Sequence, residues 1–216
     1  MTVRAASDRS LLVSFGAAVS PEAHRLVMRL THALHGERGI LNLHPAYASV
    51  LIDFDPRLRT LPEIEALVGE RMEPAGESAR PTTTRLVEIP ACYGAAYGPD
   101  LEDVARHAGL SPERVVELHT AADYEVAFVG FATCFPYLTG LPPAIATPRL
   151  ASPRKLVPAG SVAIGGSQAG IYPLASPGGW RLIGRTPLHL FDPHGEPPAL
   201  LRMGDRVRFV AAEARF

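Results

Sequence analysis

Proline and glycine are distributed unevenly along the chain, and this distribution restricts its possible architectures more than any other feature. Residues 1–80 contain five prolines and five glycines, whereas residues 81–216 contain 16 and 14. Long helices accommodate few of these residues, but short strands joined by tight turns require them. The segment from Glu73 to Thr84 is small, polar and proline-bearing, which is typical of a linker. We therefore expect two domains, residues 1–80 and residues 81–216.

The first domain is expected to be a two-layer α+β sandwich in the order ββαββα. Ser20 is a good helix N-cap, Pro21 follows in the first helical position, and Leu26, Leu30 and Leu34 recur every four residues on one face. The other expected elements are a helix that begins at Thr60 and strands at Val3–Ala6, Leu11–Phe15, Ile40–Leu43 and Ser49–Phe54.

The second domain is expected to be mainly β, with two helices near its start. One helix spans Pro99–Ala108 and ends at Gly109, and the next has Ser111 as its N-cap and Pro112 in its first position. After these helices the pattern changes to short β-rich runs broken by glycine and proline, which is typical of a barrel or a sandwich. The expected strands are Arg85–Ile89, Tyr124–Val129, Ser161–Ile164, Trp180–Ile183, Leu188–Phe191 and Arg206–Val210.

Charge and composition exclude several classes of function. The formal net charge is -1 and no run of five like charges occurs, so neither a nucleic-acid footprint nor a membrane-surface role is indicated. Lys155 is the only lysine and lies outside any Gly-Lys-Ser/Thr sequence, so a P-loop is absent. No window approaches 18 apolar residues, and Cys92 and Cys134 form no Cys-x-x-Cys pair. We expect a cytoplasmic protein without a disulfide framework or a metal site.

Two motifs resemble catalytic signatures without matching them. Gly165-Gly166-Ser167-Gln168-Ala169 approaches the nucleophile elbow Gly-x-Ser-x-Gly, but the fifth position is Ala169 and extended chain follows, which favours a glycine-rich turn between strands. Cys134 follows a predicted strand, and we prefer a small buried hydrophobe to a nucleophile because no histidine partner can be located.

Constrained backbone and polar side chains are concentrated between Gly130 and Pro193. Two interpretations remain open: rigid loops that carry a binding site, or tight barrel corners with solvated arginines. The polar groups able to bind anions or carbonyls are Arg149, Arg154, Ser161, Gln168, Arg185 and Thr186.

Several ordered motifs in the second domain carry a resemblance to a known family. They are Pro90-Ala91-Cys92-Tyr93-Gly94 with Tyr97-Gly98-Pro99-Asp100-Leu101, Phe135-Pro136-Tyr137-Leu138, Ala146-Thr147-Pro148-Arg149, Val157-Pro158-Ala159-Gly160-Ser161, Gly170-Ile171-Tyr172-Pro173, Ser176-Pro177-Gly178-Gly179-Trp180, Gly184-Arg185-Thr186-Pro187-Leu188 and Phe191-Asp192-Pro193. The chain resembles the 5-oxoprolinase B-subunit family, also called allophanate hydrolase subunit 1 or the KipI family. The resemblance covers nearly the full length and implies a small α+β domain followed by a cyclophilin-like β-barrel.

The resemblance also implies a function within a heteromeric complex, in which this chain is inactive alone. With a lactam-binding A subunit and a KipA-like C subunit, it would open 5-oxoproline to L-glutamate, with ATP as co-substrate and Mg²⁺ accompanying it. The residues in matching motifs that we expect to bind substrate or nucleotide are Tyr137, Arg149, Ser161, Gln168, Arg185 and Thr186. Arg149 and Arg185 are suited to clamp a phosphate or a carboxylate. The family usually reads Gly-Phe-Ala-Pro-Gly-Phe-Pro-Tyr where this chain has Thr133 and Cys134 in place of Pro-Gly, and a threonine is common at the position of Ala169.

Two alternative functions remain open within the same resemblance. One is a KipI-like inhibitor that binds a sensor histidine kinase through proline-rich loops. The other is a carboxyltransferase-related component of urea or allophanate metabolism. Neighbouring reading frames distinguish the oxoprolinase from the carboxyltransferase. A lactam-binding protein encoded nearby supports the oxoprolinase, and a biotin carboxylase supports the carboxyltransferase.

Overall fold

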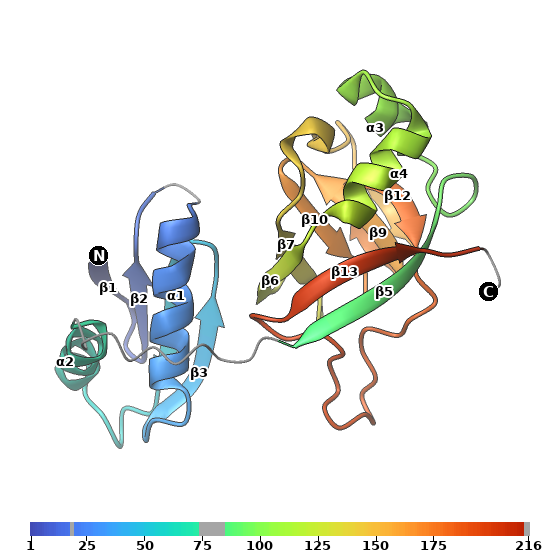
Figure 1. Cartoon of the computed structure of the whole chain (residues 1–216). Helices are drawn as coiled ribbons and strands as arrows, with labels where there is room; N and C mark the ends of the chain where they lie inside the picture. The colour runs from blue at the N-terminus through green and yellow to red at the C-terminus, as the bar shows by residue number, and fades with distance from the viewer. Residues whose placement is uncertain (18–19, 74–84, 214–216) are drawn as a thin grey trace. The chain divides into compact units, whose positions relative to one another are not determined.

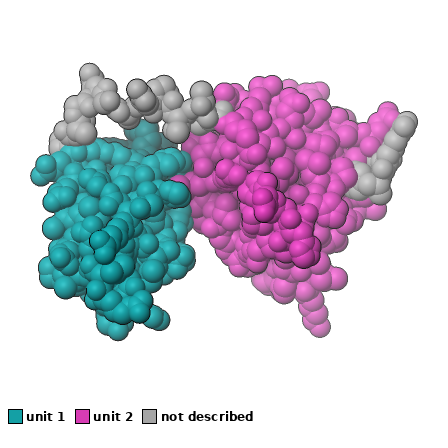
Figure 2. All heavy atoms as spheres, turned by 90° about the horizontal axis from the view of Figure 1, so that it is seen from below, with its two compact units in different colours: residues 1–82 teal, residues 83–216 magenta. Residues whose placement is uncertain are grey.

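The computed structural model describes residues 1–17, 20–73 and 85–213. The chain divides into two compact units, Met1–Thr82 and Thr83–Phe216, coloured teal and magenta in Figure 2. The expected linker falls almost entirely on residues 74–84, outside the described residues. An α+β unit is thus followed by a barrel, which confirms the predicted fold class.

Unit 1 is a four-stranded antiparallel sheet with the strand order β1-β2-β4-β3, covered by two helices. The bounds are β1 Thr2–Ser7, β2 Ser10–Ser14, α1 Pro21–Leu34, β3 Ile40–Pro45, β4 Ser49–Phe54 and α2 Leu61–Met72. Alternate residues of β2 and β4 are buried, so one face of the sheet packs against the helices. The core contains Leu11, Val13, Val27, Leu30, Leu34, Val50, Ile52, Phe54, Ile64, Leu67 and Val68.

Helix α1 begins as its sequence predicts, but its buried face is rotated from the expected one. The Ser20 side chain accepts a hydrogen bond from the Ala23 N–H at 3.1 Å, as an N-cap should. Val27 enters the core with Leu30 and Leu34, whereas Leu26 is only half-buried. A strict four-residue spacing drifts around a helix of 3.6 residues per turn, so Leu26 lies at the edge of the buried face.

Unit 2 is a closed barrel with the strand order β10-β7-β6-β13-β5-β12-β9. Strands β5 and β13 run parallel side by side, although they lie at opposite ends of the unit's sequence (Figure 1). Helix α3 packs against β12 and helix α4 against β13. The bounds are β5 Leu86–Tyr93, α3 Leu101–Ala108, α4 Pro112–Ala121, β6 Tyr124–Val129, β7 Pro136–Thr139, β9 Ser161–Gly165, β10 Gln168–Ile171, β12 Arg181–Arg185 and β13 Arg206–Ala211.

A separate two-stranded ribbon, β8 Arg154–Val157 with β11 Ser176–Gly178, and a short 3-10 helix, Pro143–Ile145, complete the unit. Of the predicted strands, Leu188–Phe191 was wrong: this segment forms only an isolated bridge between Phe191 and Ala199. Conversely, β7, β8, β10 and β11 were not predicted. They are three or four residues long, and most contain proline or glycine, so their strand signal is weak.

A histidine is fully enclosed between α4 and the barrel. His119 Nδ1 is hydrogen-bonded to the Tyr93 hydroxyl at 2.9 Å, and the ring lies 4.4 Å from that of Phe209. Among the described residues, none is hydrogen-bonded to Nε2. Burial lowers the pKa of His119 from 6.5 to about 3, so the imidazole is neutral in the folded protein.

His119 therefore makes the folded state sensitive to acid. Below about pH 6.5, His119 binds a proton in the unfolded chain but remains neutral in the folded chain. The free energy of unfolding therefore falls as the pH drops. Between pH 7.5 and pH 5, we expect the wild type to lose about 2 kcal/mol more unfolding free energy than His119→Asn, whose amide can still bond Tyr93. Urea unfolding at both pH values measures this difference. Equal losses in the two proteins would contradict it.

Candidate functional site

Five aromatic rings form a cluster on the outer side of the barrel wall. We call Phe128, Phe135, Tyr137, Tyr172 and Trp180 the aromatic face. The alternation of β7 explains its location, because Leu138 points into the barrel core while Tyr137 packs in a second core cluster. Tyr137 is stacked on Phe128 with ring centroids 4.4 Å apart and meets Trp180 edge-on at 5.7 Å. Such edge-to-face packing gives the rings a defined geometry.

A glycine in the barrel wall provides room for Trp180. A Cβ added at Gly165 would lie 2.5 Å from the indole ring, closer than any side chain allows. Gly165 pairs with Gln168 across the hairpin of β9 and β10. The near-match to a nucleophile elbow is therefore a turn between strands, as the sequence favoured, and its glycine serves the packing of Trp180.

Arg149 places a positive charge over the aromatic face. Its guanidinium carbon lies 5.5 Å from the centroid of the Trp180 ring, within the range of a cation–π interaction, while the side chain remains exposed. Backbone hydrogen bonds hold the segment on both sides: Thr147 N–H donates to Gly166 O at 3.1 Å, and Leu150 N–H donates to Gly179 O at 2.7 Å. An exposed cation is thus presented by a well-anchored loop.

The phenols next to this cation remain protonated. Burial raises the pKa of Tyr137, and Arg149 opposes part of that rise. Burial also raises the pKa of Tyr172. The hydrogen bond from the Trp180 backbone N–H and the positive charges of Arg149 and Arg154 lower this pKa in part. Both hydroxyls therefore carry their proton at neutral pH. Trp180, Tyr172 and Phe135 are at most 5% exposed, whereas Tyr137 is half-buried and Arg149 is exposed. The guanidinium is therefore the group of this cluster that an anionic ligand can reach.

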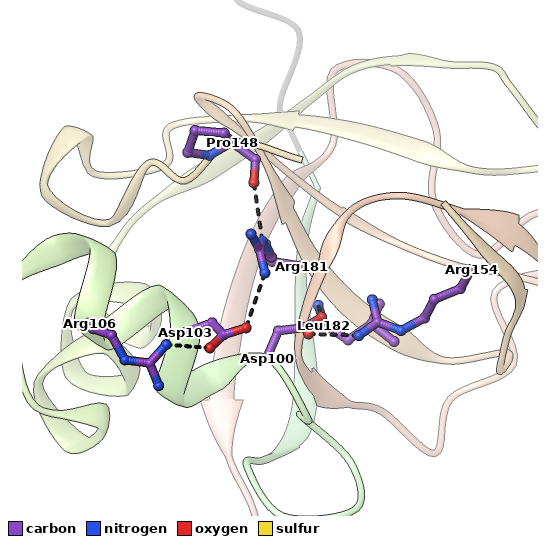
Figure 3. Close-up of polar contacts among 7 residues, drawn as sticks. All are labelled: Asp100, Asp103, Arg106, Pro148, Arg154, Arg181 and Leu182. Carbon is purple, nitrogen blue, oxygen red and sulfur yellow. Dashed lines mark hydrogen bonds and ion pairs between the residues drawn. The ribbon is translucent and has the colours of Figure 1, made fainter. Parts of the chain in front are cut away.

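A buried carboxylate supports the site from the start of helix α3 (Figure 3). Asp100 is 4% exposed, and its Oδ2 accepts from the Leu182 N–H at 2.7 Å. Its Oδ1 accepts from Nη2 of Arg154 at 2.6 Å. Leu182 packs in the same cluster as Trp180 and Tyr172. Asp100 thus links α3, β12 and the β8–β11 ribbon behind the aromatic face.

The structure divides the six residues predicted for the site into two groups. Tyr137 and Arg149 come together at Trp180. Gln168 pairs with Gly165, so it lies at the end of β9 beside Trp180. These three predicted residues belong to one region of the barrel surface.

The other three lie at the opposite end of β9, where Ser161 pairs with Arg185 of β12. Their polar groups form hydrogen bonds that stabilise the turn before Ser161. Ser161 Oγ donates to Pro158 O at 2.8 Å, and Arg185 Nε donates to Ala159 O at 2.9 Å. Thr186 N–H donates to Gly160 O at 2.9 Å. The geometry gives these residues a local structural role, and their binding roles stay predictions.

Sequence reasoning did not select Trp180 or Asp100, and it placed Arg154 only among the general anion-binding groups. Trp180 is the only tryptophan of the chain and follows Gly178-Gly179, which was a usable signal. Asp100 gave none, because a single aspartate before a helix is also an ordinary cap. Its partners lie 54 and 82 residues away in the sequence.

The loop between β6 and β7 has a strained backbone at the edge of the aromatic face. Phe131 and Cys134 have positive φ angles of 63° and 61°, in the left-handed region that favours glycine. Cys134 stands where the resembled family usually has glycine, which explains the geometry. Burial raises the pKa of the Cys134 thiol, so the thiolate of a nucleophile is disfavoured.

Replacing Cys134 with glycine should relieve part of this strain. The left-handed conformation costs an L-residue about 1–2 kcal/mol, and the greater chain entropy of unfolded glycine offsets part of the gain. We expect Cys134→Gly to raise the free energy of unfolding by about 0.5–1 kcal/mol in urea titrations. Cys134→Ala is the control, since alanine keeps the strain. A gain of the same size with alanine would contradict the explanation.

Comparison with known proteins gives consistent matches along the chain. A family model described as "Carboxyltransferase domain, subdomain C and D" matches residues 1–201. The 5-oxoprolinase B subunit of Bacillus subtilis (strain 168) is 40% identical over 215 residues, covering 94% of this chain and 89% of the relative. The 5-oxoprolinase B subunit of Escherichia coli O157:H7 is 45% identical over 204 residues, covering 94% and 92%.

Solved structures share the same fold. The crystal structure of TTHA0988 is 41% identical with a TM-score of 0.83, and the alignment covers 96% of this chain but 40% of that longer one. The conserved uncharacterized protein PH0987 from Pyrococcus horikoshii is 39% identical with a TM-score of 0.59, covering 98% of both chains.

Proposed function

Because this chain belongs to the 5-oxoprolinase B-subunit family, we propose that it is the B subunit of an enzyme that uses ATP to open 5-oxoproline to L-glutamate. Relatives of that name match nearly its whole length, and it in turn covers 89% to 97% of theirs. The extent of these matches supports the assignment, and the name itself supports a role within a multi-subunit enzyme.

The position of Arg149 over Trp180 connects this proposal to particular residues. 5-Oxoproline is a five-membered lactam that bears a carboxylate. A guanidinium can bind the carboxylate through charge-assisted hydrogen bonds, and the half-buried Tyr137 ring offers apolar surface to the lactam. Trp180 is 5% exposed and contacts the guanidinium through the cation–π interaction. The same guanidinium suits a phosphoryl oxygen. We assign the binding of one of these anionic groups to Arg149.

ATP supplies the activation that a stable lactam requires. Transfer of the γ-phosphoryl group to the lactam oxygen makes the carbonyl carbon a better electrophile. Water then adds to that carbon and the C–N bond breaks, which leaves the new carboxyl group as an acyl phosphate. A second water hydrolyses this acyl phosphate to L-glutamate and phosphate. In the described part of the chain, no three His, Cys, Asp or Glu side chains gather as a metal site. We therefore assign no ligand of the accompanying Mg²⁺ to these residues and propose that ATP binding is shared with the partner proteins.

We propose that the partners are a lactam-binding A subunit and a KipA-like C subunit, and that the complex works in the cytoplasm. Within the described residues, no helix combines the length and apolarity needed to span a membrane.

The test is an omission experiment with the three proteins of the host's complex. L-Glutamate formation from 5-oxoproline should require this chain together with the lactam-binding and KipA-like partners, and the chain should co-purify with the KipA-like partner. Undiminished glutamate formation after omission of this chain would reject the proposal. A chain that binds neither partner would also contradict it.

A further inference from the structure

Arg181 connects the loop that carries Arg149 to helix α3. It is the first residue of β12, and its guanidinium donates in two directions. Nε donates to the carbonyl oxygen of Pro148 at 3.2 Å, and Nη1 donates to Oδ2 of Asp103 at 3.1 Å (Figure 3). Pro148 immediately precedes Arg149 in the chain. The orientation of this carbonyl therefore fixes the backbone from which Arg149 projects.

Asp103 anchors the other end of this connection. Its second oxygen, Oδ1, accepts from Nη1 of Arg106 one turn later in α3 at 2.7 Å. The carboxylate is thus held between two arginines in the first turn of the helix, where a negative charge is also favoured by the helix dipole. Figure 3 shows the resulting path from Arg106 through Asp103 and Arg181 to Pro148.

The location of this contact within the loop gives it a specific consequence. Thr147 and Leu150 are fixed to Gly166 and Gly179 by backbone hydrogen bonds, so the two ends of the segment are already anchored. Arg181 acts between them, at the peptide carbonyl next to Arg149. Its side chain is 22% exposed and occupied by two acceptors, which leaves it poorly placed to bind a ligand itself.

We propose that Arg181 and Asp103 are positioning residues that hold the Arg149 guanidinium over Trp180. The pair acts through the Pro148 carbonyl and does not touch the ligand. The importance of this positioning for substrate rests on the proposed function, whereas the positioning itself is a property of the isolated chain. The two are therefore measured separately.

Trp180 reports on the position of Arg149 directly, because it is the only tryptophan. A cation 5.5 Å from the indole centroid perturbs its excited state, so Arg149→Met should shift the fluorescence emission. Arg181→Met should reproduce most of that shift, and the double variant should add nothing further. Arg181→Lys can satisfy only one of the two acceptors at a time and should show a partial shift. The control is Arg114→Met on α4, which should leave the emission unchanged.

Asp103→Asn is the second variant, chosen because it keeps the shape of the side chain and removes its charge; it should shift the emission in the same direction. Thermal unfolding and circular dichroism confirm that each variant is folded. Emission identical to wild type in both Arg181→Met and Asp103→Asn would overturn the proposal. Full additivity of the Arg149→Met and Arg181→Met shifts would overturn it as well.

A second measurement connects the positioning to the enzyme. In the assembled three-protein complex, Arg181→Met should raise KM for 5-oxoproline by a factor similar to that of Arg149→Met. If the wild-type complex does not turn over 5-oxoproline, the proposed function fails while the fluorescence result stands. If turnover is normal and only Arg149→Met raises KM, the positioning role is rejected and the proposed function survives.

Discussion

Replacing Asp100 with alanine is expected to lower the free energy of unfolding by about 3 kcal/mol. The change removes both acceptors of a carboxylate that is 4% exposed. It leaves the Leu182 N–H and the Arg154 guanidinium without their partner inside unit 2. Arg154 is 29% exposed, so water recovers part of the loss, and the expected effect lies at the lower end for a broken buried ion pair.

The matched control lies three residues later in the same helix. Asp103 also pairs with arginine, but its side chain is 42% exposed, so Asp103→Ala should cost less than about 1 kcal/mol. Urea unfolding of both variants gives the comparison. Asp100→Asn should fall between them, because its amide oxygen can still accept from Leu182 while the charge on Arg154 is lost. Equal losses for Asp100→Ala and Asp103→Ala would show that Asp100 does not have the supporting role described.

Replacing Arg149 with methionine is expected to lower kcat/KM for 5-oxoproline by about 100-fold in the assembled complex. The guanidinium would otherwise bind an anionic group through charge-assisted hydrogen bonds. Loss of about 2.7 kcal/mol of such binding corresponds to this factor. Because Arg149 is exposed, stability should change by less than about 0.5 kcal/mol.

The control for this loss is Arg114→Met, which removes an exposed arginine from α4 that pairs with Glu117. It should retain wild-type turnover. A loss of the same size in both variants would indicate a general effect of removing positive charge. Undiminished turnover in Arg149→Met would exclude Arg149 from substrate binding.

The sequence predicted the α+β unit well because its elements carry strong local signals. Ser20 with Pro21 marks the start of α1, and the alternation from Val50 to Phe54 marks a strand with one buried face. In the barrel unit the signals are weaker. Strands such as β10 and β11 are short and contain Gly170, Pro177 or Gly178, and they are stabilised by pairing with other strands.

Candidate residues could be selected from the sequence only where polar or aromatic side chains stood in recognisable motifs. Arg149 and Tyr137 were selected in this way, and the structure brings both to Trp180. Asp100 was not predictable, because its function depends on partners that folding brings together. Arg185 was selected for its chemistry, yet its Nε bonds the carbonyl of Ala159 within a turn. Residue type suggests the available chemistry, but long-range pairing decides which side chains come together in the folded chain.

The most direct test of the proposed function is phosphate release from ATP by this chain combined with the proposed lactam-binding and KipA-like partners. It is made with and without 5-oxoproline, and each component is omitted in turn. We predict phosphate release that requires both 5-oxoproline and this chain, accompanied by formation of L-glutamate. Release that is unchanged without this chain, or that ignores 5-oxoproline in the complete complex, would contradict it.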